Sequence, residues 1–440
     1  MVALLMVLLW WGGRQITADY LVEEVEDSLN CRLEIGEVEV RAVGLPSTVV
    51  LRKVRMAKRD EWVNHPLAER PALQQSELEI EEVRLAVSLL GLLMRTVDVK
   101  ELKLVNPKTR LVLREDGSSN LAEIFRSAPD REERRRRKGK KTGGSLNVEE
   151  VGLLARLDGV ALEGGELDML VEKSGIRIEV RELSGALDAI EVDPAALEET
   201  NEARLALSGT VAFGWEEEGP LEGGFLEVEG EATAKLFDPE TADLNPDLTG
   251  QLQMSEASWL SANLPPFNGM VALLGKLTSF GMKVGFWPER ARFGRGGMLG
   301  LHYHEERFTA LDPLALQLGD WELALLEESW LDLATDEHDI SGELVAAESL
   351  SGLMHLGMEK SLRYLPDSIE EAVVMELDEL WFREGRFFTH VRSHGELSDP
   401  DVDLENAFPD LKELTKEALE KAGKDKLQDL GEGLLDGLFD

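Results

Sequence analysis

Residues 97–113 read VDVKELKLVNPKTRLVL, and this stretch decides the fold. Its apolar side chains recur at every second position, with charged or polar side chains between them. A period of two places alternate side chains on opposite faces and is typical of a β-strand with one buried face. The apolar positions are Val97 and Val99, then Leu102 and Leu104, then Leu111 and Leu113.

The same alternation recurs in short stretches on both sides of this segment. Its apolar members are Leu33 and Ile35, Val38 and Val40, Val83, Leu85 and Val87, Ile176, Ile178 and Val180, Leu205 and Leu207, and Leu226 and Val228. The alternation changes parity beside Gly36, which predicts a β-bulge. The βαβ alternation of a doubly wound sheet is missing. The pattern therefore predicts a mainly β chain with peripheral helices, built on an extended antiparallel sheet with one apolar face and one acidic face.

The charge balance of the chain is extreme. Its 440 residues include 86 acidic and 47 basic side chains, for a formal net charge of −39. A surface this acidic repels phosphates, which argues against nucleic acid as a partner. Apolar residues make up 43% of the chain, enough to bury a large core. Cys31 is the only cysteine, so an internal disulfide or a zinc site built on thiolates is excluded.

The first eleven residues, MVALLMVLLWW, are all apolar. A spanning helix needs about 20 apolar residues, so two interpretations remain: a truncated membrane anchor or a buried core helix. The tryptophan pair favours an anchor over residues 1–14, because aromatic rings prefer the membrane interface. Residues 19–30 have helical spacing and predict a helix that leaves the membrane. The anchor side chains would be Leu4, Leu5, Val7, Leu8, Leu9, Trp10 and Trp11.

Residues 127–145 form a basic, low-complexity break that ends in glycines. The segment has no apolar positions to bury, so we expect a flexible loop. Two interpretations stay open. The loop is simply solvated, or it contacts anionic lipid headgroups, with each cation contributing on the order of 1 kcal/mol. The headgroup contacts would be Arg134, Arg135, Arg136, Arg137 and Lys138.

The second half of the chain mixes the two periods. Helical spacing is found in residues 247–263, 269–280 and 348–374. Strand patterns are found in residues 282–284, 307–332 and 376–401. Residues 404–440 are amphipathic, which predicts either a helix packed on the sheet or a helix that closes a groove or touches a membrane.

Residues 104–125, LVNPKTRLVLREDGSSNLAEIF, resemble the N-terminal portion of AsmA-family proteins. There, a strand reaches an x-Pro dipeptide, continues as an alternating strand, and meets an Asp-Gly-x-x-Asn turn before an amphipathic stretch. Residues 157–170 and 395–402 are similar to a later hairpin and to a closing Gly-x-Leu-x-Asp-Pro turn of the family. We expect the proline to mark an edge strand or a strand start. The matching positions are Asn106, Pro107, Asp116, Gly117 and Asn120.

The resemblance implies an inner-membrane protein with a single N-terminal anchor and a periplasmic body. That body is expected to be an elongated, curved antiparallel sheet that is groove-like, a β-taco, with an apolar inner face. The expected divisions are the anchor (1–14), a helix with the first strands (15–126), the basic loop (127–145), the continued sheet with inserted helices (146–403) and the amphipathic segment (404–440).

The family further implies lipid handling or transport and outer-membrane biogenesis. The partner would be a phospholipid or a lipopolysaccharide-type lipid, whose acyl chains gain roughly 25 cal/mol for each Å² that the apolar face buries. The alternative is a non-enzymatic envelope scaffold or assembly factor, whose sheet interior is simply a core and whose partners are proteins.

Catalytic motifs are missing from the sequence: it has no phosphate-binding loop with lysine, no Gly-x-Ser-x-Gly and no His-Glu-x-x-His. His302 and His304 would share one face of a strand and could make a metal site with neighbouring carboxylates. His390 and His394 form a second pair. Surface or hydrogen-bonded histidines are the usual explanation of such pairs, so we expect neither enzyme activity nor a cofactor or metal.

Overall fold

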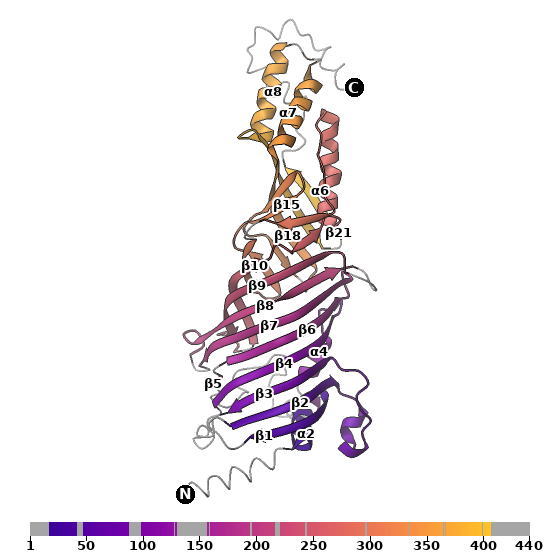
Figure 1. Cartoon of the computed structure of the whole chain (residues 1–440), viewed down its shortest axis with the longest axis vertical. Coiled ribbons are helices and arrows are strands. Elements are labelled where there is room, and N and C mark those ends of the chain that lie inside the picture. Colours follow the sequence, from indigo (N-terminus) through magenta and orange to yellow (C-terminus); the bar gives the residue numbers. More distant parts are fainter. Residues whose placement is uncertain are drawn as a thin grey trace. The chain divides into compact units, whose positions relative to one another are not determined.

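The structure is a computed structural model of the chain (Figure 1). It describes residues 17–41, 47–87, 98–126, 128–129, 156–157, 159–193, 196–215, 221–242, 244–294, 297–332, 334–363, 365, 367–397 and 399–405. The protein is mainly β, with 55% strand and 20% helix, as the alternation predicted. It divides into two compact units. Unit 1 is Met1–Ala257, Gly300–Phe308 and Leu333–Thr335, and unit 2 is Ser258–Leu299, Thr309–Asp332 and Asp336–Asp440.

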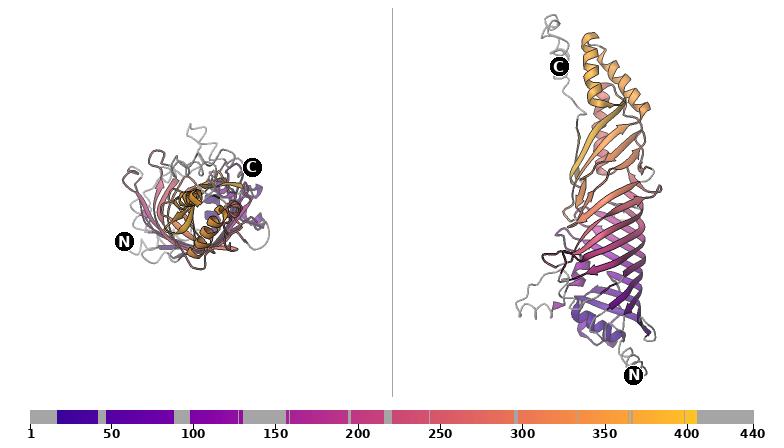
Figure 2. Two further views of the ribbon diagram at one scale, coloured as in Figure 1. Left: turned by 90° about the horizontal axis from the view of Figure 1, so that it is seen from above. Right: turned by 90° about the vertical axis from the view of Figure 1, so that its left-hand side faces the viewer.

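Unit 1 is built on a large curved sheet whose strands follow one another in space much as they do in sequence (Figure 2). Antiparallel pairs join β1 to β2, β2 to β3 and β3 to β4, and then run from β6 through β10. The predicted antiparallel sheet is therefore confirmed. The long strands are β1 (Cys31–Arg41), β2 (Ser47–Lys58), β3 (Leu78–Val87), β4 (Asp98–Leu113), β6 (Gly159–Val171), β7 (Ile176–Val192), β8 (Asn201–Gly214), β9 (Gly224–Phe237) and β10 (Leu244–Met254).

One neighbouring pair in this sheet is parallel. β4 lies parallel to β6 and to the short β5 (Arg156–Leu157). Because a hairpin cannot join parallel neighbours, the chain must cross back between them, and residues 114–158 make that connection. It includes α4 (Asn120–Phe125). The predicted basic loop also falls in this connection, and Arg134–Lys138 lie outside the described residues.

Several strands of unit 1 change their alternation along one line, which we call the crease. Gly36, Lys53, Glu81, Asn106 and Gly164 fall opposite one another in β1, β2, β3, β4 and β6. Lys53, Asn106 and Gly164 have left-handed backbone, with φ of 55°, 49° and 66°. A residue in this conformation breaks the regular pleat, so the apolar positions on its two sides differ in parity.

The β-bulge predicted at Gly36 was wrong, because the register between β1 and β2 does not change there. Ile35 lies opposite Val54, and Glu37 lies opposite Arg52, so neither strand contains an extra residue. Both strands change parity together instead. A β-bulge and a shared parity change leave the same pattern in one strand's sequence, and only the strand pairing distinguishes the two.

The crease keeps apolar side chains of both parities on one face of the sheet. Val54 and Ile80 are buried in a core cluster, and Leu51 and Val83, from the other side of the crease, pack against the same cluster. In a regular strand, residues three apart would point to opposite faces. The crease therefore produces one continuous apolar face from strands whose sequences change phase.

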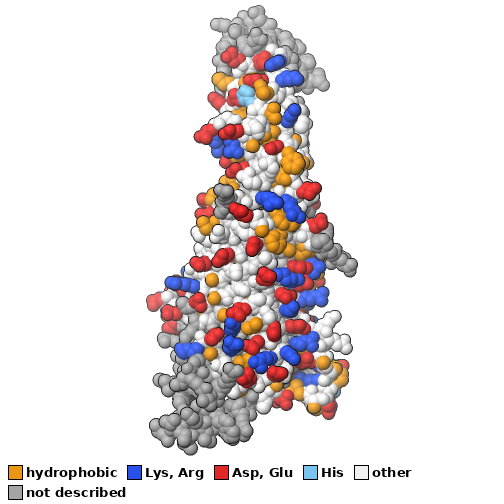
Figure 3. All heavy atoms as spheres, viewed as in Figure 1, with side chains coloured by type: hydrophobic (Ala, Val, Ile, Leu, Met, Phe, Trp, Pro, Cys, Tyr) orange, Lys and Arg blue, Asp and Glu red, His pale blue; other side chains and the backbone are white. Residues whose placement is uncertain are grey.

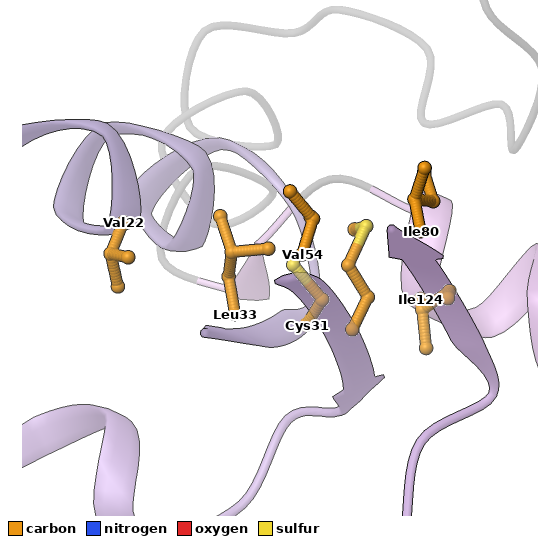
Figure 4. Close-up of a cluster of buried hydrophobic side chains, with 7 residues drawn as sticks. Val22, Cys31, Leu33, Val54, Ile80 and Ile124 are labelled. Carbon is orange, nitrogen blue, oxygen red and sulfur yellow. The ribbon is translucent and has the colours of Figure 1, made fainter. Parts of the chain in front are cut away.

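Two helices cover the apolar face where β1, β2 and β3 lie (Figure 4). α2 (Ala18–Ser28) confirms the helix predicted over residues 19–30 and begins at Thr17, whose hydroxyl accepts a hydrogen bond from the Tyr20 amide. α4 begins in the same way at Ser119. Such caps satisfy amides that the first helical turn leaves unpaired. The buried members of the cluster are Val22, Cys31, Leu33, Val54, Met56, Ile80 and Ile124.

Unit 2 combines shorter antiparallel strands with helices. Its strands are β11 (Trp259–Ser261), β12 (Arg290–Phe293), β15 (Leu314–Leu318), β16 (Trp321–Leu325), β17 (Trp330–Asp332), β18 (Glu337–Ala346), β19 (Phe382–Arg383), β20 (Arg386–Glu396) and β21 (Asp399–Glu405). α6 (Pro265–Lys276) confirms the helix predicted near 269–280, and α7 (Glu348–Leu362) and α8 (Asp367–Trp381) confirm helical structure in 348–374. The core of this unit is closed, since Leu316, Leu318 and Trp321 are at most 1% exposed.

Three predicted boundaries in the second half were wrong. The helix predicted over 247–263 was wrong, since 247–254 belong to β10 and 259–261 form β11. The period of two was hidden in β10 because Gly250 stands between Leu248 and Leu252, where an apolar side chain was expected. Residues 282–284 are not a strand; the Val284 carbonyl instead accepts the indole N–H of Trp321 at 2.8 Å. Residues 376–381 continue α8.

The predicted anchor, Leu4–Trp11, and nearly all of the amphipathic segment 404–440 lie outside the described residues. Among the helices that are described, none has both the length and the apolar character to cross a membrane.

Candidate functional site

Two rows of apolar residues cross the sheet of unit 1 side by side, from β1 to β10. We call them together the apolar strip. The first row is Val38, Leu51, Val83, Leu104, Leu162, Gly185, Leu207, Gly230 and Leu252. The second is Val40, Val49, Leu85, Leu102, Val160, Leu187, Leu205, Ala232 and Gly250. Neighbouring strands lie about 4.8 Å apart, so the strip is roughly 40 Å long.

The side chains of the apolar strip are only half-buried. Every residue of the two rows other than glycine retains intermediate exposure to solvent. The alternating leucines of unit 2 differ: Leu314, Leu316 and Leu318 in β15 are 6%, 1% and 0% exposed. The same sequence pattern therefore gives a sealed core in unit 2 and a partly open apolar surface in unit 1. Sequence alternation alone could not distinguish these two outcomes.

The opposite face of the sheet carries ion pairs between neighbouring strands. Acidic and basic side chains lie side by side over much of the surface that Figure 3 shows. Arg52 in β2 lies 3.4 Å from Glu39 in β1 and 3.3 Å from Glu82 in β3. Further along, Lys103 in β4 pairs with Glu163 in β6 at 2.5 Å. Exposed pairs such as these add little stability. They keep one face of the sheet polar, as the predicted acidic face requires, and the apolar strip lies on the other face.

Buried ion pairs close the sheet beside α2. Glu26 is 2% exposed; its carboxylate accepts hydrogen bonds from Arg70 Nη1 at 2.7 Å and from the Leu33 amide at 2.9 Å. Arg32, 3% exposed, pairs with Asp60 at 2.7 Å. A cavity of about 410 Å³ lies here, but the arginines that line it already contact carboxylates. The cluster fixes the loop that follows β2, and its arginines are already engaged by carboxylates.

Cys31 lies in the same region and has no catalytic setting. Burial, assisted by the nearby Glu26 carboxylate, raises the pKa of its thiol to about 12. A thiol with so high a pKa is not a nucleophile at neutral pH.

The residues that resemble AsmA-family motifs have structural roles at the crease and at α4. Asn106 adopts the left-handed conformation and its amide donates to the Glu81 carboxylate at 2.5 Å. Pro107 follows it inside β4, between β3 and β6. The expectation that Pro107 marks an edge strand or a strand start was therefore wrong. Proline is tolerated within this central strand because it stands next to the crease, where regular pairing is interrupted.

The Asp-Gly-x-x-Asn motif forms the turn that leads into α4. The side chain of Ser118 and then its amide, which donates to Asp116 at 2.9 Å, lower the pKa of the Asp116 carboxyl. Gly117 has a φ of 76°. Asn120 bonds back to β4: its side-chain oxygen accepts from the Val112 amide and its NH2 group donates to the Arg110 carbonyl, both at 2.8 Å. The motif thus holds α4 against the sheet.

Three of the four histidines in the two predicted pairs lie near a carboxylate: His302 near Asp247, His304 near Glu305 and His394 near Asp403. His302 and His304, in β13 (Met298–His304), stack with ring centroids 6.2 Å apart, and His302 Nε2 lies 2.9 Å from Asp247. His390 and His394 both lie in β20, and His394 Nε2 is 3.3 Å from Asp403 in the neighbouring β21. Across the part of the chain that the structure describes, no three potential metal ligands come together.

Comparison with known proteins gives no relative: no protein-family model, curated protein or solved structure matches this chain.

Proposed function

We propose that the protein carries the acyl chains of lipids on the apolar strip, as a membrane-anchored factor in envelope lipid handling. The observation that carries the proposal is the half-buried state of the strip, against the fully buried leucines of unit 2. A sealed core has no room for a ligand, whereas partly exposed leucines and valines gain free energy when hydrocarbon covers them.

The shape of the strip suits a chain-like apolar ligand. It is two residues wide and roughly 40 Å long, at about 4.8 Å for each strand. An acyl chain laid along it gains about 0.8 kcal/mol for each CH2 removed from water. The two rows of leucine, valine, alanine and glycine offer no polar side chain to select one acyl chain. We therefore expect a class of lipids, phospholipid or lipopolysaccharide-type, rather than one compound.

The resemblance of residues 104–125 to AsmA-family proteins supports the same proposal. It adds the expected inner-membrane anchor, the periplasmic body and a role in outer-membrane biogenesis. In that setting, the curved sheet would form a groove with the apolar strip inside it and the ion-paired face outside.

The test uses the full chain in a bacterial host, with the photoreactive residue benzoylphenylalanine in place of Leu207 or in place of Ala206. Leu207 belongs to the apolar strip, whereas Ala206, its exposed neighbour in β8, points to the other face. We expect lipid adducts in the mass spectrum of the first protein and none in that of the second. In a separate variant, Leu207→Asp should reduce the lipid that co-purifies, whereas Ala206→Asp should not.

The scaffold alternative predicts a different outcome. If the strip only faces protein, the reagent at Leu207 will form protein cross-links or none, and the folded protein will be free of lipid. Either result would refute acyl-chain carriage and favour an envelope scaffold that binds protein partners.

A further inference from the structure

α7 has two apolar faces, and only one of them is covered. Its inner face, with Leu350, Met354, Met358 and Leu362, is buried at 5% exposure or less. A second pair of leucines points elsewhere: Leu353 is 49% exposed and Leu356 is 62% exposed. The second pair needs an explanation, because the helix already packs against α8, beside it in Figure 1, and against β20.

Two cations continue the outer face of α7. Lys360 and Arg363 follow Leu353 by seven and ten residues, so they lie on the same side of the helix. Both are exposed, and neither has a carboxylate partner among the described residues. Ser349 and Gly352, the other exposed residues of this face, are uncharged. Two acids lie at its edge: Glu348, and Glu359, whose carboxylate is 3.5 Å from His355 Nδ1. In a chain with a net charge of −39, the face between them combines apolar and basic groups.

The neighbouring helix provides a contrast. Met375 in α8 is 55% exposed, but Glu371 and Glu379, four residues before and after it, lie on the same face and are exposed too. An anionic surface would repel the two carboxylates that flank this methionine. His355 joins the two helices, with Nε2 3.0 Å from Asp378, so the two faces are held in one hairpin.

From these observations we infer that the outer face of α7, formed by Leu353, Leu356, Lys360 and Arg363, binds the surface of an anionic lipid bilayer. Leucines enter the interface between headgroups and acyl chains, and the cations pair with phosphates. A stable protein partner would need roughly 20–30 contacting residues on each side, far more than this face offers. A bilayer needs no such area, since its apolar and electrostatic contributions add residue by residue.

The inference extends the proposed function, because a protein that carries lipid must meet a bilayer to load or release it. It involves unit 2 alone, and none of its residues belongs to the apolar strip. Cross-linking at Leu207 can therefore fail while α7 still binds membranes, and the reverse can also occur.

The experiment places an environment-sensitive NBD fluorophore on the outer face of the full-length protein. Gly352→Cys is suitable, because an added Cβ there meets no atom within 4 Å and both leucines are kept. The native Cys31 is fully buried, with a thiol pKa raised to about 12, and should not be labelled. Vesicles made of equal parts phosphatidylcholine and phosphatidylglycerol should shift the NBD emission to the blue. Vesicles of phosphatidylcholine alone should shift it less.

Control variants separate this face from the predicted N-terminal anchor. A label at Met375→Cys on α8 should not respond, although any anchor would bring it equally near the vesicles. Adding Leu353→Ser with Leu356→Ser, or Lys360→Glu with Arg363→Glu, should abolish the shift at Gly352→Cys. Equal responses at Gly352→Cys and Met375→Cys, no response at Gly352→Cys, or a blue-shifted emission before vesicles are added would each overturn the inference.

Discussion

The crease makes a quantitative prediction at Gly164. This residue has a φ of 66°, and a Cβ built on it would overlap the side-chain oxygen of Asn106 in the neighbouring strand. In Gly164→Ala, the left-handed backbone should cost about 1–2 kcal/mol. Moving Asn106 aside should also break its hydrogen bond to Glu81, at a cost of about 1 kcal/mol. We expect the variant to lose about 2–3 kcal/mol of stability in total.

Gly117→Ala is the matched control. Gly117 has a similar φ of 76°, but an added Cβ would meet no atom within 4 Å. It should therefore show only the backbone cost of about 1–2 kcal/mol. Since a chain of two units need not unfold in one step, the assay is native-state hydrogen exchange of the slowest amides in β4 and β6.

A second substitution tests whether the extra loss comes from Asn106. Asn106→Gly removes the oxygen that the new methyl group meets, and glycine accepts the left-handed backbone freely. In the double variant, the excess cost of Gly164→Ala over Gly117→Ala should disappear, which gives a coupling of about 1 kcal/mol between the two sites. If Gly164→Ala costs no more than Gly117→Ala, or if Asn106→Gly recovers nothing, the crease is not the packed line described above.

Three further predictions concern buried groups. Glu26→Ala should destabilise unit 1 by about 3–5 kcal/mol in urea unfolding, because it leaves the Arg70 side chain, only 10% exposed, without its carboxylate partner. Arg70→Met in the same protein should recover part of the loss. Ellman's reagent at pH 8 should label Cys31 only after denaturation, because its thiol pKa is about 12; labelling of the native protein would contradict this. Burial holds the pKa of His338 below its ordinary 6.5, so the folded protein favours the neutral imidazole. The contribution of His338 to the free energy of unfolding should therefore be full above pH 6.5 and decline below it. Urea unfolding of His338→Gln as a function of pH should lack this decline.

Several features were predictable because their cause is local. The alternation in residues 97–113 gave β4, and the apolar spacing in 19–30 and 348–374 gave α2, α7 and part of α8. The helix predicted over residues 247–263 was wrong because the period of two in β10 was interrupted. Gly250 lies in the second row of the strip, where Ala232 of β9 occupies the space that a Cβ would fill. The remaining leucines of β10 are spaced as in a helix, so the sequence predicted a helix there.

By itself, the sequence determined the mainly β class, the alternation of apolar and polar side chains along the strands and the approximate positions of α2, α6 and α7. These depend on residues only a few positions apart. Only the tertiary structure decided that β4 and β6 are parallel, that the parity changes at Lys53 and Gly164 fall on one crease, and that Leu207 is half-buried while Leu316 is sealed. The physical reason is that register and burial depend on which strands become neighbours, and distant segments settle that by packing together.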